Sequence, residues 1–237
     1  MAAFFTDPGP GPGLDRAGPG RRGRVERVRF TPVSPDRLVT DLADWIECLP
    51  QRRPRVVVDG FDETGAAWLA DALSEVLGSR GRPVVRVSTR WWWRAASLRL
   101  EYGREDLDML LGGWLDTAAL RREVLDPLAD DGTGVYLDRL RDPDSDRSIR
   151  KDRHRALAGT VLIVDSPFAA TWDVQGDARV HLQVAVSTVA RKLPDGRQWW
   201  VEAYRRYLDE DRPVESADVV IAYDHPSSPA VAWPTPR

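Results

Sequence analysis

Two glycines with the spacing of a phosphate-binding loop follow a short apolar run that ends at Asp59. In a working loop of the pattern G-x-x-x-x-G-K-[ST], backbone N–H groups wrap the phosphates, the Lys reaches the outer phosphates and the hydroxyl holds Mg²⁺. Gly60 and Gly65 have this spacing here, but Ala66 and Ala67 occupy the Lys and Ser/Thr positions. The sequence therefore predicts the backbone of such a loop without the side chains that do its chemistry.

The elements around the two glycines are those that the motif requires. Val56 to Asp59 is predicted to be a short buried strand. Apolar residues then recur at helical spacing from Trp68 to Leu77, which predicts a helix ending near Gly78 and Gly81. Strand, glycine-spaced turn and helix is the context in which the motif binds phosphate.

The rest of the chain alternates between strand and helix patterns. A leading helix is predicted after Ser34-Pro35, an N-cap followed by a proline in the first turn. Further strands are predicted at 83–88, 160–165, 180–186 and 217–223, and helices around 105–111, 117–128 and 197–209. Residues 134–141 are predicted to be a strand or hairpin arm and 142–155 a charged, flexible segment. This alternation favours an α/β fold with a doubly wound parallel sheet and helices on both faces.

Composition limits the class of protein. The chain has 237 residues, of which 42% are hydrophobic, and this is enough for one sizeable domain with its own core. Residues 1–23 are dominated by Pro, Gly and Arg and are predicted to be a disordered tail, which leaves 24–237 as a single domain. A net charge of −3 argues against a nucleic-acid partner.

The number and spacing of Cys and His, and the length of the apolar runs, indicate the cellular compartment and whether a metal is bound. Cys48 is the single cysteine and the three histidines are scattered, so we predict no disulfide framework and no metal site. No apolar run approaches the roughly 18 residues of a membrane span, and no signal peptide is recognisable. We expect a cytoplasmic protein without a membrane partner.

Several segments resemble the uridine kinase and nucleoside kinase-like proteins of actinobacteria. They are SLRLEYGR at 97–104, GWLD at 113–116, LRREVLDPL at 120–128, VLIVD at 161–165, YRRY at 204–207 and ADVV at 217–220. The resemblance covers roughly residues 28–233. It implies a Rossmann-like P-loop NTPase fold that transfers the γ-phosphoryl group of ATP to the 5′-hydroxyl of a pyrimidine ribonucleoside, with ATP and Mg²⁺ as the cofactors.

The resemblance also assigns a substrate site, from which the main catalytic group is missing. In relatives the second strand ends in an acidic segment of the type D-D-F, whose carboxylate handles the nucleoside hydroxyl. Arg90, Trp91 and Trp92 occupy the matching positions here. A cation and an indole cannot accept that proton. Arg104 and Asp142 are assigned to the substrate side as well.

Two other acidic residues keep the family pattern. Asp116 is in the expected frame, and Asp165, at the end of its apolar strand, matches a carboxylate that relatives place near the metal or the substrate. Ser166 follows it where a glycine is usual. Capping of the following turn is an equal alternative for Asp165, because an Asp at a strand end is common in α/β folds. Asp116 and Asp165 are the predicted catalytic residues.

Charges in and near the loop leave alternatives open. Related nucleotide kinases tolerate an acidic residue at Asp62, whereas Glu63 adds negative charge close to a polyanion. The basic run at 147–155 is either a lid that closes on phosphates or a solvated surface loop, the commoner meaning of such runs. What remains of a cofactor site is assigned to Gly60, Asp62, Gly65, Ala66 and Ala67.

Ten tryptophans, three of them consecutive at 91–93, are the least expected part of the composition. Consecutive residues at a strand end point in different directions, so at least one of these three is expected to line a cleft or the surface. Three roles stay open: packing in a disused pocket, stacking on a nucleobase, worth about 1–3 kcal/mol, and contact with a protein partner.

The missing side chains favour a binding protein over a kinase. Losing one preorganised donor lowers a rate by about 10²–10³, and losing a general base by about 10²–10⁴. We therefore predict a uridine kinase-like protein with degenerate catalytic residues, a pseudoenzyme that binds a nucleoside or nucleotide. The alternatives are an active uridine kinase whose cations come from Arg86, Arg90 or the 147–155 run, and a protein-interaction scaffold that uses its Trp-rich end.

Overall fold

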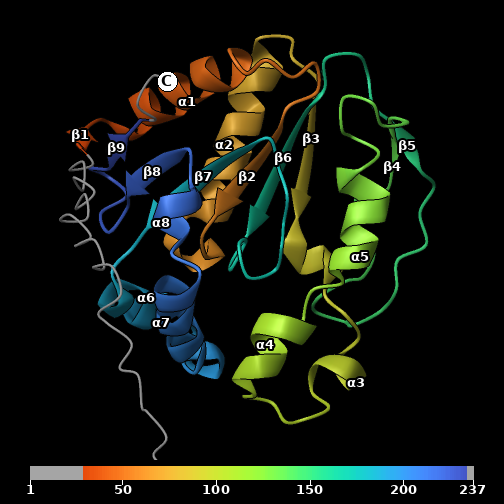
Figure 1. Cartoon of the computed structure of the whole chain (residues 1–237), viewed down its shortest axis with the longest axis vertical. Helices are drawn as coiled ribbons and strands as arrows, with labels where there is room; N and C mark the ends of the chain where they lie inside the picture. Colours follow the sequence, from red (N-terminus) through yellow and green to blue (C-terminus); the bar gives the residue numbers. More distant parts are fainter. Residues whose placement is uncertain (1–28, 234–237) are drawn as a thin grey trace, which may run out of the picture.

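The computed structural model describes residues 29–233, and its centre is a seven-stranded sheet flanked by helices (Figure 1). The strand order is β1-β9-β8-β7-β2-β6-β3. The strands are β1 (Thr31–Pro32), β2 (Arg55–Asp59), β3 (Val84–Ser88), β6 (Val161–Ser166), β7 (Ala178–Gln183), β8 (Val219–Ala222) and β9 (Ala230–Ala232).

Five neighbouring strands are parallel, which confirms the predicted fold class. β3, β6, β2, β7 and β8 pair in parallel, and β9 and β1 extend the sheet antiparallel to them at one edge. β2 and β6 each contain a continuous apolar run, as expected for strands of a sheet covered by helices: Val56, Val57 and Val58 of β2 are buried, and so are residues 161–164 of β6. The predicted disordered tail, residues 1–23, lies outside the described residues.

Two helices pack together beside the sheet. α1 (Pro35–Glu47) begins as predicted, with the Ser34 hydroxyl accepting the Arg37 N–H at 3.3 Å and Pro35 in the first turn. α2 (Ala66–Ser79) follows the glycine-spaced turn, lies beside α1 in Figure 1, and contacts β2, β3 and β6. The predicted strand, turn and helix are therefore present.

The remaining helices are shorter. They are α3 (Ala96–Arg99), α4 (Leu107–Gly113), α5 (Thr117–Leu120), which continues as a π-helical turn at Arg121–Leu125, α6 (Val186–Lys192), α7 (Trp200–Glu210) and α8 (Pro213–Ser216). α6 begins inside the stretch predicted to be strand 180–186, where two alternating valines extend the strand pattern past the true end of β7 at Gln183.

The charged segment 142–155 is held by contacts with the rest of the domain, among them the Ala96 N–H donating to Asp146 at 2.9 Å. β4 (Val135–Tyr136) pairs antiparallel with β5 (His154–Arg155), which gives the predicted hairpin arm its partner. Within the segment, Lys151 pairs with Asp138 at 2.9 Å, and Arg153 pairs with Glu123. These two basic residues are thus bound to carboxylates on 123–138.

The topology places one end of the sheet in a position to bind ligands. β2 pairs with β6 on one side and with β7 on the other, so the chain changes direction across the sheet at β2. Ligands of open α/β sheets bind beyond the carboxyl ends of the strands at such a point. Figure 1 shows the arrowheads of β2, β3 and β6 directed to the same end, where α3, α4 and α7 lie.

Candidate functional site

The turn between Gly60 and Gly65 uses its backbone N–H groups internally. Residues 62–64 form a 3₁₀ turn, and the N–H groups of Thr64, Gly65 and Ala66 donate to the Phe61 carbonyl at 3.0, 3.1 and 3.2 Å. The Gly65 N–H also reaches the Asp62 carbonyl at 3.0 Å. A loop that binds phosphate offers such groups to its ligand. In the observed conformation these three N–H groups share acceptors within the turn.

Gly65 is required by packing. Its φ is +114°, and a Cβ at this position would lie 2.6 Å from a ring carbon of Tyr223, the residue that follows β8. The Tyr223 ring is buried, which raises the pKa of its phenol to about 12. The second glycine of the motif therefore admits an aromatic ring against the turn, a role that needs no phosphate.

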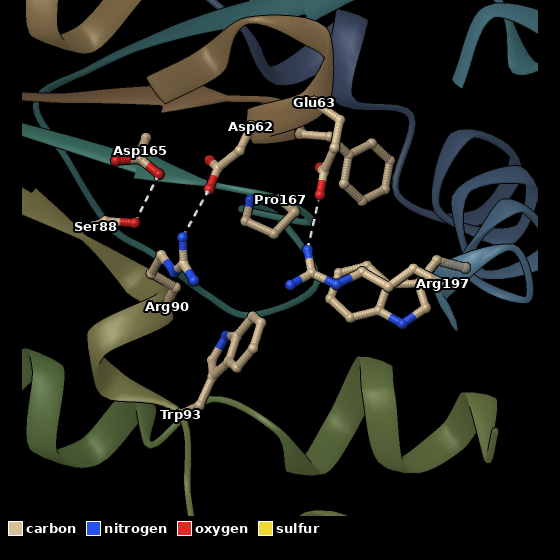
Figure 2. A pocket seen from close by; sticks show the side chains of 10 residues that line it. Asp62, Glu63, Ser88, Arg90, Trp93, Asp165, Pro167 and Arg197 are labelled. Atoms are coloured by element: carbon tan, nitrogen blue, oxygen red, sulfur yellow. Dashed lines mark hydrogen bonds and ion pairs between the residues drawn. The ribbon is translucent and has the colours of Figure 1, made fainter. Parts of the chain in front are cut away.

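The two carboxylates of the turn are paired with arginines from distant parts of the chain. The Arg90 guanidinium lies 4.0 Å from the Asp62 carboxylate, and the Arg197 guanidinium lies 2.8 Å from the Glu63 carboxylate. Figure 2 shows Asp62 and Glu63 extending from the turn toward these two cations, with the Trp93 ring rising from the opposite side. The acidic turn (Asp62 and Glu63) thus supplies anions of its own at the end of β2.

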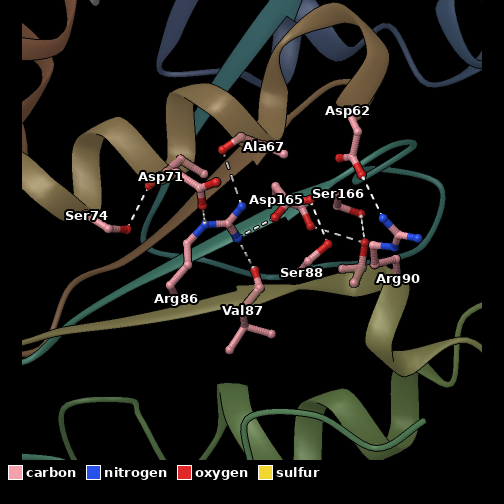
Figure 3. A network of polar contacts seen from close by, with 12 residues as sticks. Asp62, Ala67, Asp71, Ser74, Arg86, Val87, Ser88, Arg90, Asp165 and Ser166 are labelled. Atoms are coloured by element: carbon pink, nitrogen blue, oxygen red, sulfur yellow. Dashed lines mark hydrogen bonds and ion pairs between the residues drawn. The ribbon is translucent and has the colours of Figure 1, made fainter. Parts of the chain in front are cut away.

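Asp165 lies behind Asp62 and is almost fully buried, with 1% of its surface exposed. Ser88 Oγ donates to one carboxylate oxygen at 2.8 Å, and Arg86 pairs with the other. Arg86 also donates to the Asp71 carboxylate at 2.8 Å, as Figure 3 shows. Both carboxylate oxygens of Asp165 are therefore engaged by side chains of β3.

Crowding of carboxylates changes the proton affinity of Asp62. Burial, followed by the negative charges of Asp165 and Glu63, raises the pKa of Asp62 to about 7, against the smaller opposing effect of Arg90. Near neutral pH this carboxyl is therefore poised between its charged and neutral forms.

Three hollows surround the acidic turn. The smallest, about 20 Å³, has room for a water molecule and is lined by Phe61, Asp62, Glu63, Ser88, Arg90, Trp93, Asp165, Pro167, Arg197 and Trp200. A wider one of about 270 Å³ lies on the Arg86 and Trp91 side, and an open groove of about 390 Å³ lies beside Gly65, Trp68 and Tyr223.

Aromatic rings form the wall of the smallest hollow. Trp200 lies at the centre of the cluster, 6.0 Å from Trp93 and 5.3 Å from Trp114 between ring centroids, and Arg197 stacks over Trp200 at 5.1 Å. Arg99 lies over the Trp114 ring at 4.7 Å. Within the described part of the chain, the indole N–H groups of Trp92, Trp93, Trp114 and Trp200 have no acceptor.

The three consecutive tryptophans point to different surroundings, as predicted, although Trp91 and Trp92 lie in a 3₁₀ turn (Thr89–Trp92) after β3 and not at a strand end. Trp92 is fully buried in the core, so its ring is closed to a ligand in this conformation. Trp93 lines the smallest hollow, and the half-buried Trp91 lines the wider one with Arg139 4.7 Å over its ring.

The remaining predicted residues lie away from the turn. Asp116 caps α5 by accepting the Ala119 N–H at 3.0 Å. Asp142 closes an exposed turn by accepting from the Asp144 N–H at 3.0 Å and the Ser145 hydroxyl at 2.8 Å. Arg104 is exposed between α3 and α4. None of these three lines a hollow beside the acidic turn.

Two features of the site had no signal in the sequence. Arg197 is separated from Glu63 by 134 positions, and its neighbours form no motif. The other feature is a buried network under the turn. Asp59 accepts from Tyr207 Oη at 2.7 Å and from the Ala169 N–H at 3.1 Å, and it contacts His181 Nδ1 at 2.7 Å.

The hydrogen-bond partners of Asp59 keep this fully buried acid in its charged form. Burial favours its neutral form, but the charge of His181 and the hydrogen bonds from His181, Tyr207 and Ala169 together outweigh burial and hold the pKa of Asp59 below its usual value. Burial and the same carboxylate raise the pKa of Tyr207 well above its usual range. Asp59 is therefore anchored as an anion at the end of β2.

Comparison with solved structures identifies the fold. A "possible uridine kinase" from Bacillus stearothermophilus matches with a TM-score of 0.62 at 19% identity, over 77% of this chain and 96% of that one. A "putative fructose transport system kinase" from Silicibacter sp. TM1040 matches with a TM-score of 0.55 at 16% identity, over 78% and 95%. The YGR205w protein matches with a TM-score of 0.58 at 10% identity, over 86% and 100%.

These likenesses define an α/β fold of the P-loop NTPase type, shared with uridine kinase-like proteins. No protein-family model matches the chain, and no curated protein matches it by sequence. In residues 29–233, no helix has the length and apolar character to cross a membrane, and no group of three or more His, Cys, Asp or Glu side chains is arranged to hold a metal.

The cofactors that the fold family implies do not fit the site as it stands. Ala66 and Ala67 offer neither amine nor hydroxyl, the N–H groups that follow Asp62 are bound to Phe61, and two carboxylates project where a polyanion would lie. The arrangement lacks the amine and the hydroxyl with which the motif holds a triphosphate and Mg²⁺.

Proposed function

We propose that the chain is a uridine kinase-like pseudoenzyme that binds a nucleoside or nucleotide and does not transfer phosphate. The observation that carries this proposal is the internal bonding of the turn: three N–H groups are satisfied by the Phe61 carbonyl, and both acidic side chains have arginine partners. Phosphoryl transfer depends on positioning and charge stabilisation, and the turn contributes charge of the wrong sign.

The wider hollow offers a ligand an aromatic wall and polar groups beyond the turn, of which only Asp62 lines it. It lies at the carboxyl end of β3 and has an aromatic ring, Trp91, beside carboxylate and guanidinium groups from Asp138, Arg86 and Arg90. An aromatic face with a few convergent polar groups suits a nucleobase and its sugar. A nucleoside is therefore the ligand class that the proposal favours, in a cytoplasmic protein.

The scaffold alternative has less support at the tryptophan cluster. Trp92, Trp93, Trp114 and Trp200 are all buried within the chain's own core, where they are closed to a partner. The active-kinase alternative would need a free cation near the loop, but Arg86 and Arg90 are already paired with carboxylates. In the basic run 147–155, Lys151 and Arg153 are also paired with carboxylates.

Two measurements test the proposal. A coupled assay with uridine or cytidine and ATP should give turnover below about 0.1 s⁻¹, far under the roughly 10 s⁻¹ of an ordinary enzyme. A thermal-shift series with nucleosides and nucleotides, with and without Mg²⁺, should show saturable stabilisation by at least one nucleoside. Turnover above this limit that Asp165→Ala abolishes would establish the active-kinase alternative. If no ligand stabilises the protein, the protein-interaction scaffold becomes the better account.

A matched variant pair separates lost side chains from lost backbone geometry. If backbone N–H groups can still turn toward a phosphate, Ala66→Lys with Ala67→Thr should improve Mg-ATP binding by about 2 kcal/mol, as expected for charge-assisted contacts. Gly78→Lys with Ser79→Thr, at the exposed end of α2, is the control for added charge. If the first pair folds and binds Mg-ATP no better than wild type, the turn has lost its phosphate-binding geometry.

A further inference from the structure

The carboxylates of the acidic turn occupy two arginines in the way that a bound anion would. Its two carboxylates are adjacent in sequence, yet they contact cations from two separate elements, Arg90 after β3 and Arg197 before α7. Arg90 also pairs with the exposed Asp144, at 3.3 Å compared with 4.0 Å to Asp62. Both guanidinium groups are about one third exposed, and both line the smallest hollow together with the turn. Arg197 contributes its single ion pair in the described residues to Glu63.

Unpartnered donors line the same hollow. Arg90 Nε, Trp93 Nε1 and Trp200 Nε1 are buried, belong to lining residues, and have no acceptor within residues 29–233. The two tryptophans are more than nine-tenths buried. A buried donor without an acceptor costs free energy, so native proteins rarely retain several in one place unless an ordered molecule accepts from them.

Two guanidinium groups and residues with unpartnered donors thus line the hollow, and the turn supplies two of its three carboxylates; the third, Asp165, is paired with Arg86. We propose that Arg90 and Arg197, with the Trp93 and Trp200 N–H groups, form a binding site for a small dianion, a phosphate monoester or a dicarboxylate, and that Asp62 and Glu63 occupy this site as an internal competitor. This inference does not depend on the nucleoside ligand proposed above.

This arrangement determines how the dianion would fit and how its charge would be balanced. The hollow of about 20 Å³ is too small for such a dianion, so the turn must move aside when the ligand enters. A dianion would replace two carboxylates at the same two arginines, which conserves the local charge. Moving the turn also releases the N–H groups of Thr64, Gly65 and Ala66 from the Phe61 carbonyl.

The experiment removes the competitor and measures affinity for inorganic phosphate. Isothermal titration at constant ionic strength is carried out on wild type, on Asp62→Asn with Glu63→Gln, and on the same double variant with Arg197→Met. Glu202→Gln, which removes an exposed carboxylate paired with Arg205 on α7, is the control. We expect phosphate to bind the double variant about ten-fold more tightly than wild type or the control, and the gain to disappear with Arg197→Met.

A parallel titration with succinate distinguishes the two sources of the dianion. A gain for either anion supports the site and assigns its chemistry. If the double variant folds and gains affinity for neither anion, or if the gain persists without Arg197, the proposal is wrong. If the double variant does not fold, Glu63→Gln alone decides, with an expected gain of about three-fold and no gain as the contrary result.

Failure of this inference and failure of the proposed function are distinguishable. Stabilisation of wild type by a nucleoside, with no phosphate or succinate gain in the double variant, would leave the nucleoside site and remove the dianion site. A gain in affinity for phosphate or succinate, without any nucleoside binding, would support the dianion site and remove the nucleoside site.

Discussion

Two carboxylates at the end of β2, three residues apart, have opposite surroundings. Asp59 is fully buried and meets His181, Tyr207 and the Ala169 N–H, so it remains charged and its pKa is lowered. Asp62 is less buried, but it faces Asp165 and Glu63, and its pKa is raised to about 7. Burial alone does not decide the charge of an acid; the number of donors and the sign of its neighbours do.

The comparison predicts the largest effect at Asp59. Asp59→Ala removes the partner of His181 and Tyr207 inside the core, and it should lower the free energy of unfolding by about 3–5 kcal/mol, the usual cost of breaking a buried pair. Urea unfolding followed by circular dichroism measures this. Asp44→Ala, which removes an exposed partner of Arg80, is the control and should cost at most about 1 kcal/mol. Equal effects of the two variants would contradict the anchoring role of Asp59.

The turn that separates these carboxylates should be sensitive to a single methyl group. Gly65→Ala introduces a Cβ at 2.6 Å from the Tyr223 ring and at a positive φ, so we expect a loss of at least about 2 kcal/mol. Gly78→Ala in α2 meets nothing within 4 Å and should be neutral or stabilising by up to about 1 kcal/mol. Thermal or urea unfolding of both variants decides; a harmless Gly65→Ala would show that Tyr223 does not hold the turn.

The smallest effect is expected from Asp62 and depends on pH. Its raised pKa means that the folded state binds the proton more tightly than the unfolded state does. Its contribution to stability is therefore present below about pH 4 and is lost as the pH rises to about 7. Asp62→Asn should remove this loss and stabilise the protein by about 1 kcal/mol at pH 8 relative to wild type, with little difference at pH 4. If Asp62→Asn is less stable than wild type at pH 8, the attraction between Asp62 and Arg90 outweighs burial and the repulsion from Asp165 and Glu63.

Much of the fold could be predicted because its signals are local. The apolar run of β2, the two glycines and the helical spacing of α2 all lie within residues 55–79, and the Ser34-Pro35 cap fixes the start of α1. The antiparallel edge formed by β9 and β1 gave no comparable pattern, because β1 has two residues and β9 has three.

The site was less predictable because its contacts connect distant residues. Glu63 meets Arg197 across 134 positions, and Asp59 meets His181 across 122 and Tyr207 across 148. Residue types alone indicated that the phosphate-binding side chains are missing. They could not show that the N–H groups of Thr64, Gly65 and Ala66 turn inward, or that the turn packs against Tyr223, a residue distant in the sequence.

The short antiparallel edge also affects how copies of the chain meet. An exposed strand offers a row of free N–H and C=O groups, on which strands of other molecules can add and start aggregation. β1 ends the sheet after only Thr31 and Pro32, and proline has no N–H to donate. This end of the sheet therefore gives a neighbouring chain little to pair with, unlike the opposite edge, which is the five-residue strand β3.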